Sequence, residues 1–101
     1  MKWIYICSPL RGDYEGNTAA AIRYCREVAL QGDFPIAPHI YCPRFLDDTK
    51  PEERQHGVAI GLGLLKKCDE VHVYGYHISD GMRTELNVAS LLSIPVYYKK
   101  G

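Results

Sequence analysis

The sequence lacks several features that would assign it to a broad class of proteins. Its 12 Lys and Arg residues balance 12 Asp and Glu residues, so no basic excess favours a nucleic acid partner. No apolar run approaches the roughly 20 residues that a membrane-spanning helix needs, and the one at the amino terminus is too short for a signal peptide. The pattern G-x-x-x-x-G-K-[ST] is absent, which argues against a P-loop kinase or triphosphatase.

The cysteines are too scattered for a disulfide framework or a zinc site. Cys7, Cys25, Cys42 and Cys68 include no C-x-x-C pair, and a small secreted scaffold usually carries a denser set. His39 and Cys42 have a ligand-like gap, but no second closely spaced pair accompanies them, so we expect no metal. These observations predict reduced thiols in a cytoplasmic protein, and no feature singles out a cofactor.

The composition is that of an ordinary globular protein. Of the 101 residues, 47% are hydrophobic and 24% are charged, which predicts one domain over residues 1–101 with a modest core. A cleft on so small a domain would stay open on one side. We therefore expect a homodimer or a higher homo-oligomer.

Short apolar runs alternate with helical segments along the chain. Strands are predicted over residues 2–7, 34–38, 70–76 and 95–98, and helices over 17–31, 51–67 and 80–94. The second of these strands is flanked by prolines and is predicted to lead into an extended loop over residues 39–45. This order predicts a small α/β fold of the Rossmann or flavodoxin-like type, a three-layer sandwich with helices on both faces of a four-stranded, mainly parallel sheet.

The first helix has a recognisable start and an apolar stripe. Asn17 or Thr18 is expected to be its cap, and Ile22, Cys25 and Ala29 are expected to face the core.

The second helix begins with the spacing of a capping box, from Thr49 to Glu52. It contains Gly57, Gly61 and Gly63, each of which costs about 1 kcal/mol relative to alanine. These glycines indicate either close packing against a neighbouring element or room cleared for a ligand.

The stretch from Ser79 to Leu86 reads as a strand-to-helix turn, with Ser79 or Asp80 as the cap. Free backbone N–H groups and the helix dipole favour an anion at such a turn. Glu85 lies about one turn further along the helix. An anion cradle beside a carboxylate indicates chemistry on a phosphorylated molecule.

Three predicted loops, 8–13, 39–45 and 79–84, would meet at the carboxyl ends of the strands, where open α/β sheets bind ligands. Their titratable candidates for protonating a leaving group are His39 and Asp80.

Taken in chain order, these motifs resemble the nucleoside 2-deoxyribosyltransferase superfamily. The matching segments are YICSPLRG at 5–12, Pro38-His39, CDEV at 68–71, and SDG at 79–81 together with Glu85. Within the superfamily they are most similar to the 2′-deoxynucleoside 5′-phosphate N-hydrolases and to small bacterial and phage domains. The resemblance covers nearly the whole chain.

The resemblance implies a role for each matched position. Glu85 would be the nucleophile that attacks the anomeric carbon, and the Tyr5 hydroxyl would position it. The implied binding residues are Ser8, Leu10, Arg11 and Gly12 in one phosphate loop, Ser79, Gly81 and Met82 in the other, and His39 beside the nucleotide.

One position departs from the pattern. The superfamily usually has an aspartate that assists departure of the base, eight residues before the position of Asp69, and here that residue is Gly61. Either another acid substitutes, or the chain binds nucleotides without cleaving them efficiently. Asp69 itself is interpreted as a turn residue at a helix end.

Plainer interpretations stay open for the same residues. Glu85 could be a solvated helix residue, Arg11 a surface loop residue, Tyr5 a core tyrosine, His39 a loop residue and Asp80 a helix cap. The sequence predicts an N-glycosidase or deoxyribosyltransferase-like enzyme acting on a (deoxy)nucleoside 5′-monophosphate. The alternative is a non-catalytic protein that binds a nucleotide or ribosyl-phosphate signal in the same cleft.

Overall fold

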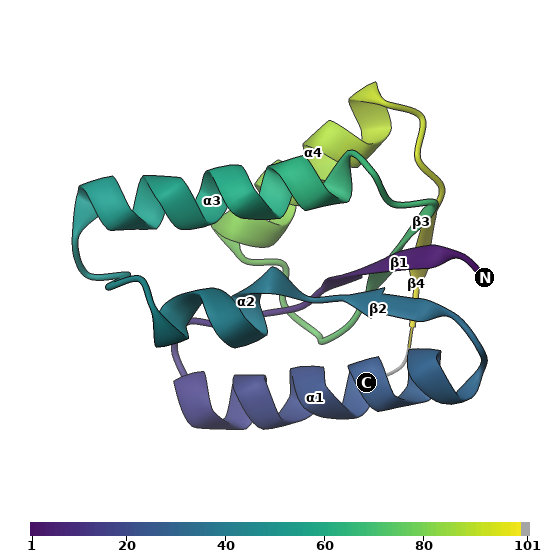
Figure 1. Ribbon diagram of the computed structural model, residues 1–101, viewed down its shortest axis with the longest axis horizontal. Coiled ribbons are helices and arrows are strands. Elements are labelled where there is room, and N and C mark those ends of the chain that lie inside the picture. The colour runs from purple at the N-terminus through teal and green to yellow at the C-terminus, as the bar shows by residue number, and fades with distance from the viewer. Residues whose placement is uncertain (100–101) are drawn as a thin grey trace.

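Four parallel strands form the centre of the fold (Figure 1). They are β1 (Trp3–Cys7), β2 (Phe34–Ile36), β3 (Glu70–Val73) and β4 (Val96–Tyr98), in the spatial order β2-β1-β3-β4. The computed structural model describes residues 1–99, so the last two positions of the predicted domain lie outside it. Every strand pair in the described part is parallel, so the predicted mainly parallel sheet is in fact all-parallel.

Helices cover both faces of this sheet. Figure 1 shows α1 (Tyr14–Leu30) on one face and α3 (Pro51–Leu65) with α4 (Asp80–Leu91) on the other. The short helix α2 (Pro38–Tyr41) and the 3-10 helix η1 (Cys42–Arg44) follow β2. The predicted flavodoxin-like sandwich is therefore confirmed. None of the helices within residues 1–99 has the length and apolarity that crossing a bilayer requires.

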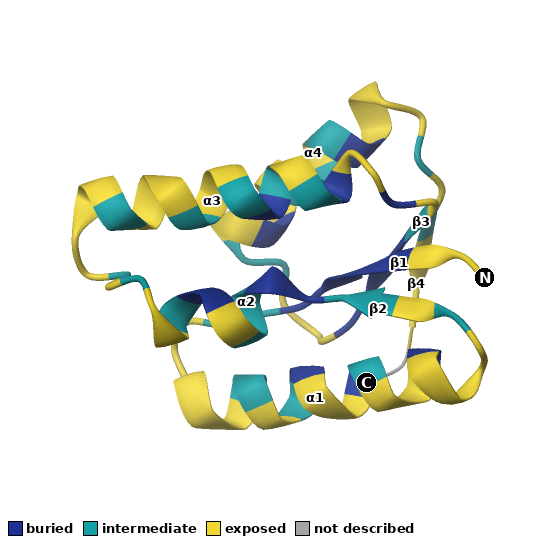
Figure 2. Cartoon of the chain, viewed as in Figure 1, coloured by how far each residue is buried: buried dark blue, intermediate teal, exposed yellow. Residues whose placement is uncertain are grey.

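The central strand β1 divides the core in two because its side chains alternate between the faces of the sheet. Ile4 and Ile6 pack towards α1, beside Tyr24 and Val28 of that helix. The residues between and after them, Tyr5 and Cys7, pack in the other cluster, beneath α3 and α4. Figure 2 shows the resulting buried centre and the exposed outer faces of the helices. The face occupied by Tyr5 is the one that carries the site described below.

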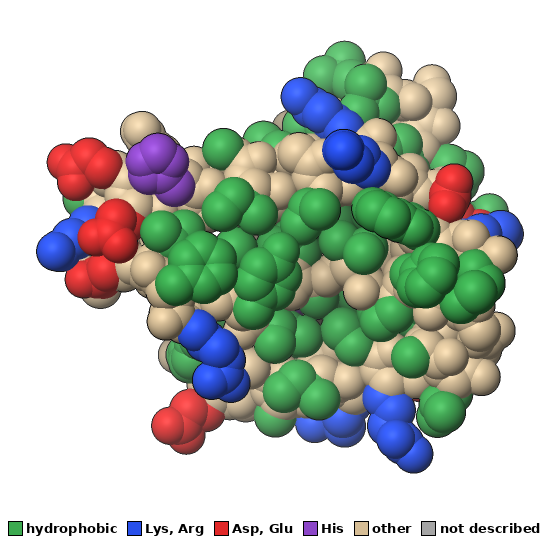
Figure 3. Space-filling model, in the orientation of Figure 1, with side chains coloured by type: hydrophobic (Ala, Val, Ile, Leu, Met, Phe, Trp, Pro, Cys, Tyr) green, Lys and Arg blue, Asp and Glu red, His purple; other side chains and the backbone are tan. Residues whose placement is uncertain are grey.

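Hydrophobic side chains also gather on one outer face. Figure 3 shows them between the α1 and α3 layers, where β2 forms the edge of the sheet. The exposed large apolar side chains of the chain include Trp3 (38%), Phe34 (44%), Tyr41 (44%) and Phe45 (59%).

The first helix begins earlier than predicted. Asp13 is the cap, since its carboxylate accepts a hydrogen bond from the Gly16 N–H at 3.1 Å, and α1 starts at Tyr14. Asn17, predicted as the cap, instead donates its side-chain N–H groups to the Leu10 and Arg11 carbonyls at 3.1 and 3.2 Å. The prediction was wrong because Asp13 was assigned to the preceding loop by composition.

The predicted apolar stripe of α1 is also displaced. Ala21, Tyr24 and Val28 are the buried residues. Of the predicted stripe, Cys25 packs against the core and is partly buried, whereas Ile22 is 50% exposed and Ala29 is exposed. A stacked contact fixes this rotation, because the ring of Tyr24 lies 3.9 Å from that of Tyr74 at the end of β3.

Residues 39–44 are helical, and the predicted extended loop is wrong. Pro38 stands in the first turn of α2 and Pro43 in the first turn of η1. Proline is favoured there because its fixed φ suits a helix start and its missing N–H has no intrahelical acceptor to lose. The local pattern predicts a strand end at Pro38 and a loop at Pro43, and both residues instead begin helices.

The start of α3 does not use the predicted capping box. Thr49 donates its hydroxyl to Asp47 Oδ1 at 2.6 Å, and Lys50 at the cap position makes no side-chain capping bond. Glu53, not Glu52, reaches back, and it accepts from the Asp47 N–H at 2.9 Å.

The strand β3 ends at Val73, three residues before its predicted end. Gly75 has φ +98°, and a Cβ there would lie 3.2 Å from Pro9 Cδ. This tight turn directs the chain across the carboxyl end of β1 and into α4.

Candidate functional site

A cavity of about 720 Å³ lies at the carboxyl ends of β1 and β3. This is where the strand order reverses, because β2 lies on one side of β1 and β3 on the other. Its volume is in the range of small-molecule sites. Of the residues predicted to form the site, the lining includes Tyr5, Ser8, Leu10, Arg11, His39, Ser79, Asp80, Gly81, Met82 and Glu85. Gly12 is absent from the lining, and its φ of +97° lies in the left-handed region that favours glycine.

At the floor of the cavity the Glu85 carboxylate is held by two donors from β1. The Tyr5 hydroxyl donates a short hydrogen bond to Glu85 Oε2. The Cys7 thiol lies 3.5 Å from the other oxygen, Oε1. Glu85 is thus not a solvated residue on the outer face of α4.

Burial raises the pKa of Glu85, and the hydrogen bonds from Tyr5 and Cys7 lower it, with burial the larger effect. Burial, followed by the nearby Glu85 charge, raises the pKa of Tyr5. The phenol therefore stays protonated and keeps donating to the carboxylate. A carboxylate desolvated in this way is a stronger nucleophile and base than one in water.

Gly61 on α3 lies directly over this pair. A Cβ at Gly61 would be 3.2 Å from the Tyr5 hydroxyl oxygen and 3.9 Å from Pro38 Cγ. Gly57, one turn earlier, also lines the cavity, while a Cβ at Gly63 would meet nothing within 4 Å. Both sequence interpretations of the helix glycines therefore apply to Gly61, which packs closely against Tyr5 and lines the cavity.

His39 faces Ser8 across the cavity, with 2.9 Å between His39 Nε2 and Ser8 Oγ. Burial lowers the pKa of His39 to about 4, so the imidazole is neutral at pH 7. A neutral imidazole is a poor general acid. The other rim candidate for protonating a leaving group, Asp80, also lines the cavity.

The start of α4 has the geometry of an anion cradle. Ser79 is the cap, and its hydroxyl accepts from the Met82 N–H at 3.2 Å. Asp80 and Gly81 line the cavity, and their N–H groups, in the first turn of the helix, have no intrahelical acceptor. A phosphate could accept hydrogen bonds from both.

Arg11 stands at the rim and already has an anionic partner. Its guanidinium bonds the Asp48 carboxylate at 2.9 Å and the Asp48 carbonyl at 3.3 Å, and both side chains are about half exposed. A ligand phosphate would therefore have to displace Asp48 or share Arg11 with it.

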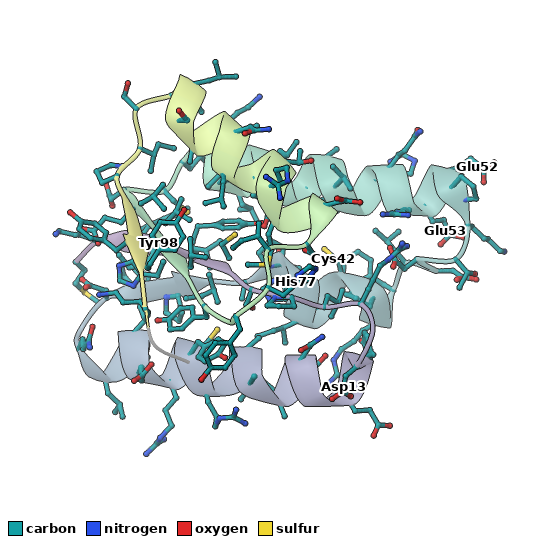
Figure 4. The ribbon with its side chains drawn as sticks, turned by 180° about the vertical axis from the view of Figure 1, so that it is seen from behind. Asp13, Cys42, Glu52, Glu53, His77 and Tyr98 are labelled. Carbon is teal, nitrogen blue, oxygen red and sulfur yellow. The ribbon has the colours of Figure 1, made fainter. Side chains whose placement is uncertain are left out.

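Several lining residues carry no clear sequence signal. Cys42 at the start of η1 and His77 in the loop before α4, both labelled in Figure 4, line the cavity. So do Asp48, Arg54 and Arg83. His77 and Arg83 flank the 79–82 turn and could have been included for that reason, whereas Asp48 and Arg54 enter only through the packing of α3 on α2.

Asp69 lies at the amino end of β1, opposite the end that carries the cavity. Its Oδ2 accepts from the Trp3 N–H at 2.8 Å, which ties the end of the α3–β3 connection to the first residue of β1. Among residues 1–99, no three His, Cys, Asp or Glu side chains gather in a way that could hold a metal ion.

Comparison with solved structures shows the same fold in nucleoside-processing enzymes. The chain superposes on a 2-deoxyribosyltransferase from Bacillus psychrosaccharolyticus with a TM-score of 0.72 and 21% identity, covering 97% of this chain and 72% of that one. A 2-deoxyribosyltransferase from Leishmania mexicana gives 0.66 and 16%, covering 99% and 65%. The CMP N-glycosidase of Clostridium botulinum gives 0.57 and 12%, covering 99% and 89%. The protein thus has the α/β fold of the deoxyribosyltransferases and this N-glycosidase.

The sequence itself matches a family model. The chain belongs to DUF7768, a family described as a domain of unknown function, whose profile matches residues 2–99. The comparison with curated proteins finds no match.

Proposed function

We propose that the protein is an N-glycosidase or deoxyribosyltransferase-like enzyme that cleaves the N-glycosidic bond of a (deoxy)nucleoside 5′-monophosphate. The observation that carries the proposal is the partly buried Glu85 carboxylate, held by Tyr5 at the floor of a cavity of small-molecule size. The shared fold with two 2-deoxyribosyltransferases and a CMP N-glycosidase supports the class of reaction.

Glu85 would act as the nucleophile. One of its oxygens forms a bond to the anomeric carbon while the C–N bond breaks, and the electron pair of that bond leaves with the base, which takes up a proton. Asp80 is the proposed proton donor. Water, or a second base in a transferase, then attacks the same carbon and gives its proton to the Asp80 carboxylate, while the electron pair of the ester bond returns to Glu85.

The 5′-phosphate would bind at the start of α4 and beside Arg11. The N–H groups of Asp80 and Gly81 would donate to it, and Arg11 would exchange part of its contact with Asp48 for the phosphate. Ser8 and His39, bonded to each other, would contribute neutral polar groups on the opposite wall.

A non-catalytic role in the same cleft is the second candidate. The observation favouring it is Gly61, which supplies no carboxylate where the resembled superfamily usually has one. In that case the cavity would capture a nucleotide or ribosyl-phosphate signal without cleaving it.

The discriminating experiment is detection of free base after the purified protein is incubated with ribo- and deoxyribonucleoside 5′-monophosphates. Release that disappears in Glu85→Gln supports the enzyme. No release, together with calorimetric binding that Arg11→Ala abolishes, supports the binding protein. Neither release nor binding would reject both candidates.

We also propose that the protein is a cytoplasmic homo-oligomer. The apolar side chains exposed beside the β2 edge (Figure 3) could be buried in a contact between subunits. The four cysteines are free, as a reducing compartment maintains them. A monomer mass by light scattering at micromolar protein would reject the oligomer.

A further inference from the structure

Within residues 1–99, Tyr5 and Cys7 are the side chains that hydrogen-bond the Glu85 carboxylate, and Cys7 has no role in the proposed function. It is the last residue of β1, it is fully buried, and it lies two positions after Tyr5. Residues two apart on a strand share one face of the sheet, so both side chains reach the same carboxylate. Tyr5 bonds Oε2, and the Cys7 sulfur lies 3.5 Å from Oε1.

The Cys7 thiol has two acceptors within reach and one proton. The Met82 carbonyl, one turn before Glu85 on α4, lies 3.9 Å from the sulfur. Glu85 Oε1 is nearer and, when ionised, charged, so the proton is directed to it. When Oε1 can no longer accept, the Cys7 S–H can donate its hydrogen bond to the Met82 carbonyl instead. The buried thiol then still has an acceptor.

We propose that Cys7 is a positioning residue that orients Glu85 Oε1 as the attacking oxygen; this inference rests on the proposed function. A thiol is a weak hydrogen-bond donor, so it fixes the direction of Oε1 while withdrawing little charge from it. The stronger donor, the Tyr5 hydroxyl, holds Oε2. In this proposal Oε2 anchors the carboxylate through Tyr5, and Oε1 is the oxygen that attacks the anomeric carbon.

A reactive role for Cys7 itself does not fit its surroundings. Burial, followed by the nearby Glu85 charge, raises the pKa of the Cys7 thiol, so it stays protonated and is a poor nucleophile. The same protonated state is the one that can donate to Glu85.

Few titratable groups surround Glu85 from the neighbouring elements. Tyr5 and Cys7 of β1 touch the carboxylate, and the α3 wall opposite presents Gly61 there. The other charged or titratable side chains of the cavity are Arg11, His39, Cys42, Asp48, Glu53, Arg54, His77, Asp80 and Arg83. A substitution of Cys7 therefore removes one of the two hydrogen bonds to the Glu85 carboxylate and leaves the bond from Tyr5 in place.

The test is the titration of the Glu85 carboxyl in the full chain, followed by carbon-13 NMR with labelled glutamate and assigned by the signal lost in Glu85→Gln. Cys7→Ala removes a donor to the ionised form, so the Glu85 pKa is expected to rise. Cys68→Ala is the matched control, since Cys68 is buried in the same core cluster but donates to the Leu64 carbonyl at 3.3 Å. It is expected to leave the Glu85 titration unchanged.

Cys7→Val, which fills the space without a donor, provides the same test if the alanine variant does not fold. An unchanged Glu85 titration in a folded Cys7 variant, or an equal change in Cys68→Ala, would overturn the inference while leaving the proposed function standing.

Base release supplies the second readout. Loss of one weak hydrogen bond to the nucleophile is expected to lower kcat about fivefold with KM unchanged. The acid limb of the profile of kcat against pH is expected to move to higher pH. An unaltered kcat would contradict the role of Cys7. If the wild-type protein releases no base from any nucleotide, the positioning role falls together with the proposed function, even where the titration has shifted.

Discussion

Tyr5 and Glu85 are 80 positions apart in the chain and share a hydrogen bond. The contact arises because β1 is a central strand whose carboxyl end faces the start of α4, and because Gly61 leaves room for the Tyr5 hydroxyl. A single added carbon at position 61 would enter the same space as this hydroxyl.

The substitution Gly61→Ala is expected to lower base release at least tenfold, about 1.4 kcal/mol, because its Cβ would stand 3.2 Å from the Tyr5 oxygen and push it away from Glu85. Gly63→Ala, two residues along the same helix, has open space around its Cβ. It is expected to keep activity and to raise the free energy of unfolding by up to ~1 kcal/mol. Enzyme assays and urea unfolding of the two variants check this, and equal activity in both would contradict it.

The histidine facing Ser8 makes stability depend on pH. The pKa of His39 is about 4 in the folded chain against 6.5 as its ordinary value, so the unfolded state binds the proton more readily. The stability that the neutral imidazole contributes is complete above pH 6.5 and is lost as the pH falls towards 4, by up to ~3 kcal/mol.

Urea unfolding of the wild type and His39→Gln, at pH 7 and at about pH 4.5, measures this loss. The wild type is expected to lose more stability than the variant on acidification. His56→Gln, on the exposed face of α3, controls for the removal of an imidazole. A parallel loss in the wild type and His39→Gln would show that His39 is not the group responsible.

Among the elements, α4 combines a structural cap with a binding role. The Ser79 hydroxyl accepts from the Met82 N–H, and the same turn presents the N–H groups proposed to hold phosphate. Stability and ligand binding can therefore be separated by the choice of side chain at this one position.

Ser79→Ala is expected to lower the free energy of unfolding by about 1 kcal/mol, because the cap is lost. Ser79→Asp keeps a capping oxygen and adds a negative charge, so it should retain stability while weakening the binding of any nucleotide monophosphate. Thermal unfolding and calorimetric titration measure the two effects. Ser90→Ala, exposed in the same helix, is the control, and phosphate affinity unaltered in Ser79→Asp would argue against the cradle.

Considered as a whole, the molecule has a stable centre and weaker edges. β1 and β3 each pair with two strands, whereas β2 and β4 are three-residue edge strands with one partner each. Local opening of an edge exposes little core, so it costs less free energy than opening of the centre.

Hydrogen exchange is therefore expected to be slowest at amides that join the central strands. The Tyr74 N–H, bonded to the Cys7 carbonyl at 2.9 Å, should exchange only with global unfolding. The Lys99 N–H, bonded to the Val73 carbonyl at the end of β4, should exchange faster through local opening. Exchange-detected NMR at several urea concentrations distinguishes them, and equal protection would contradict the division.

Much of the fold was predictable from local pattern. The four strands and the long helices follow from apolar runs and helical spacing, and their alternation leads to a parallel sheet with helices on both faces. The Ser79 turn could be read as a helix start because its cap is local. The errors fell where two local signals competed. The pattern predicts Asp13 as a loop residue, Pro38 as the end of a strand and Pro43 as part of a loop, although all three stand at the start of a helix.

The sequence alone determined the order of strands and helices, because each element depends on residues that are neighbours in the chain. It also determined the edge of the sheet at which the polar loops meet. Only the tertiary structure decided that Tyr5 and Cys7 hold opposite oxygens of Glu85, that Gly61 lies over the Tyr5 hydroxyl, and that Asp48 engages Arg11. Those contacts join segments that are distant in the chain, and they depend on strand order and on the rotation of each helix about its axis, which no local pattern specifies.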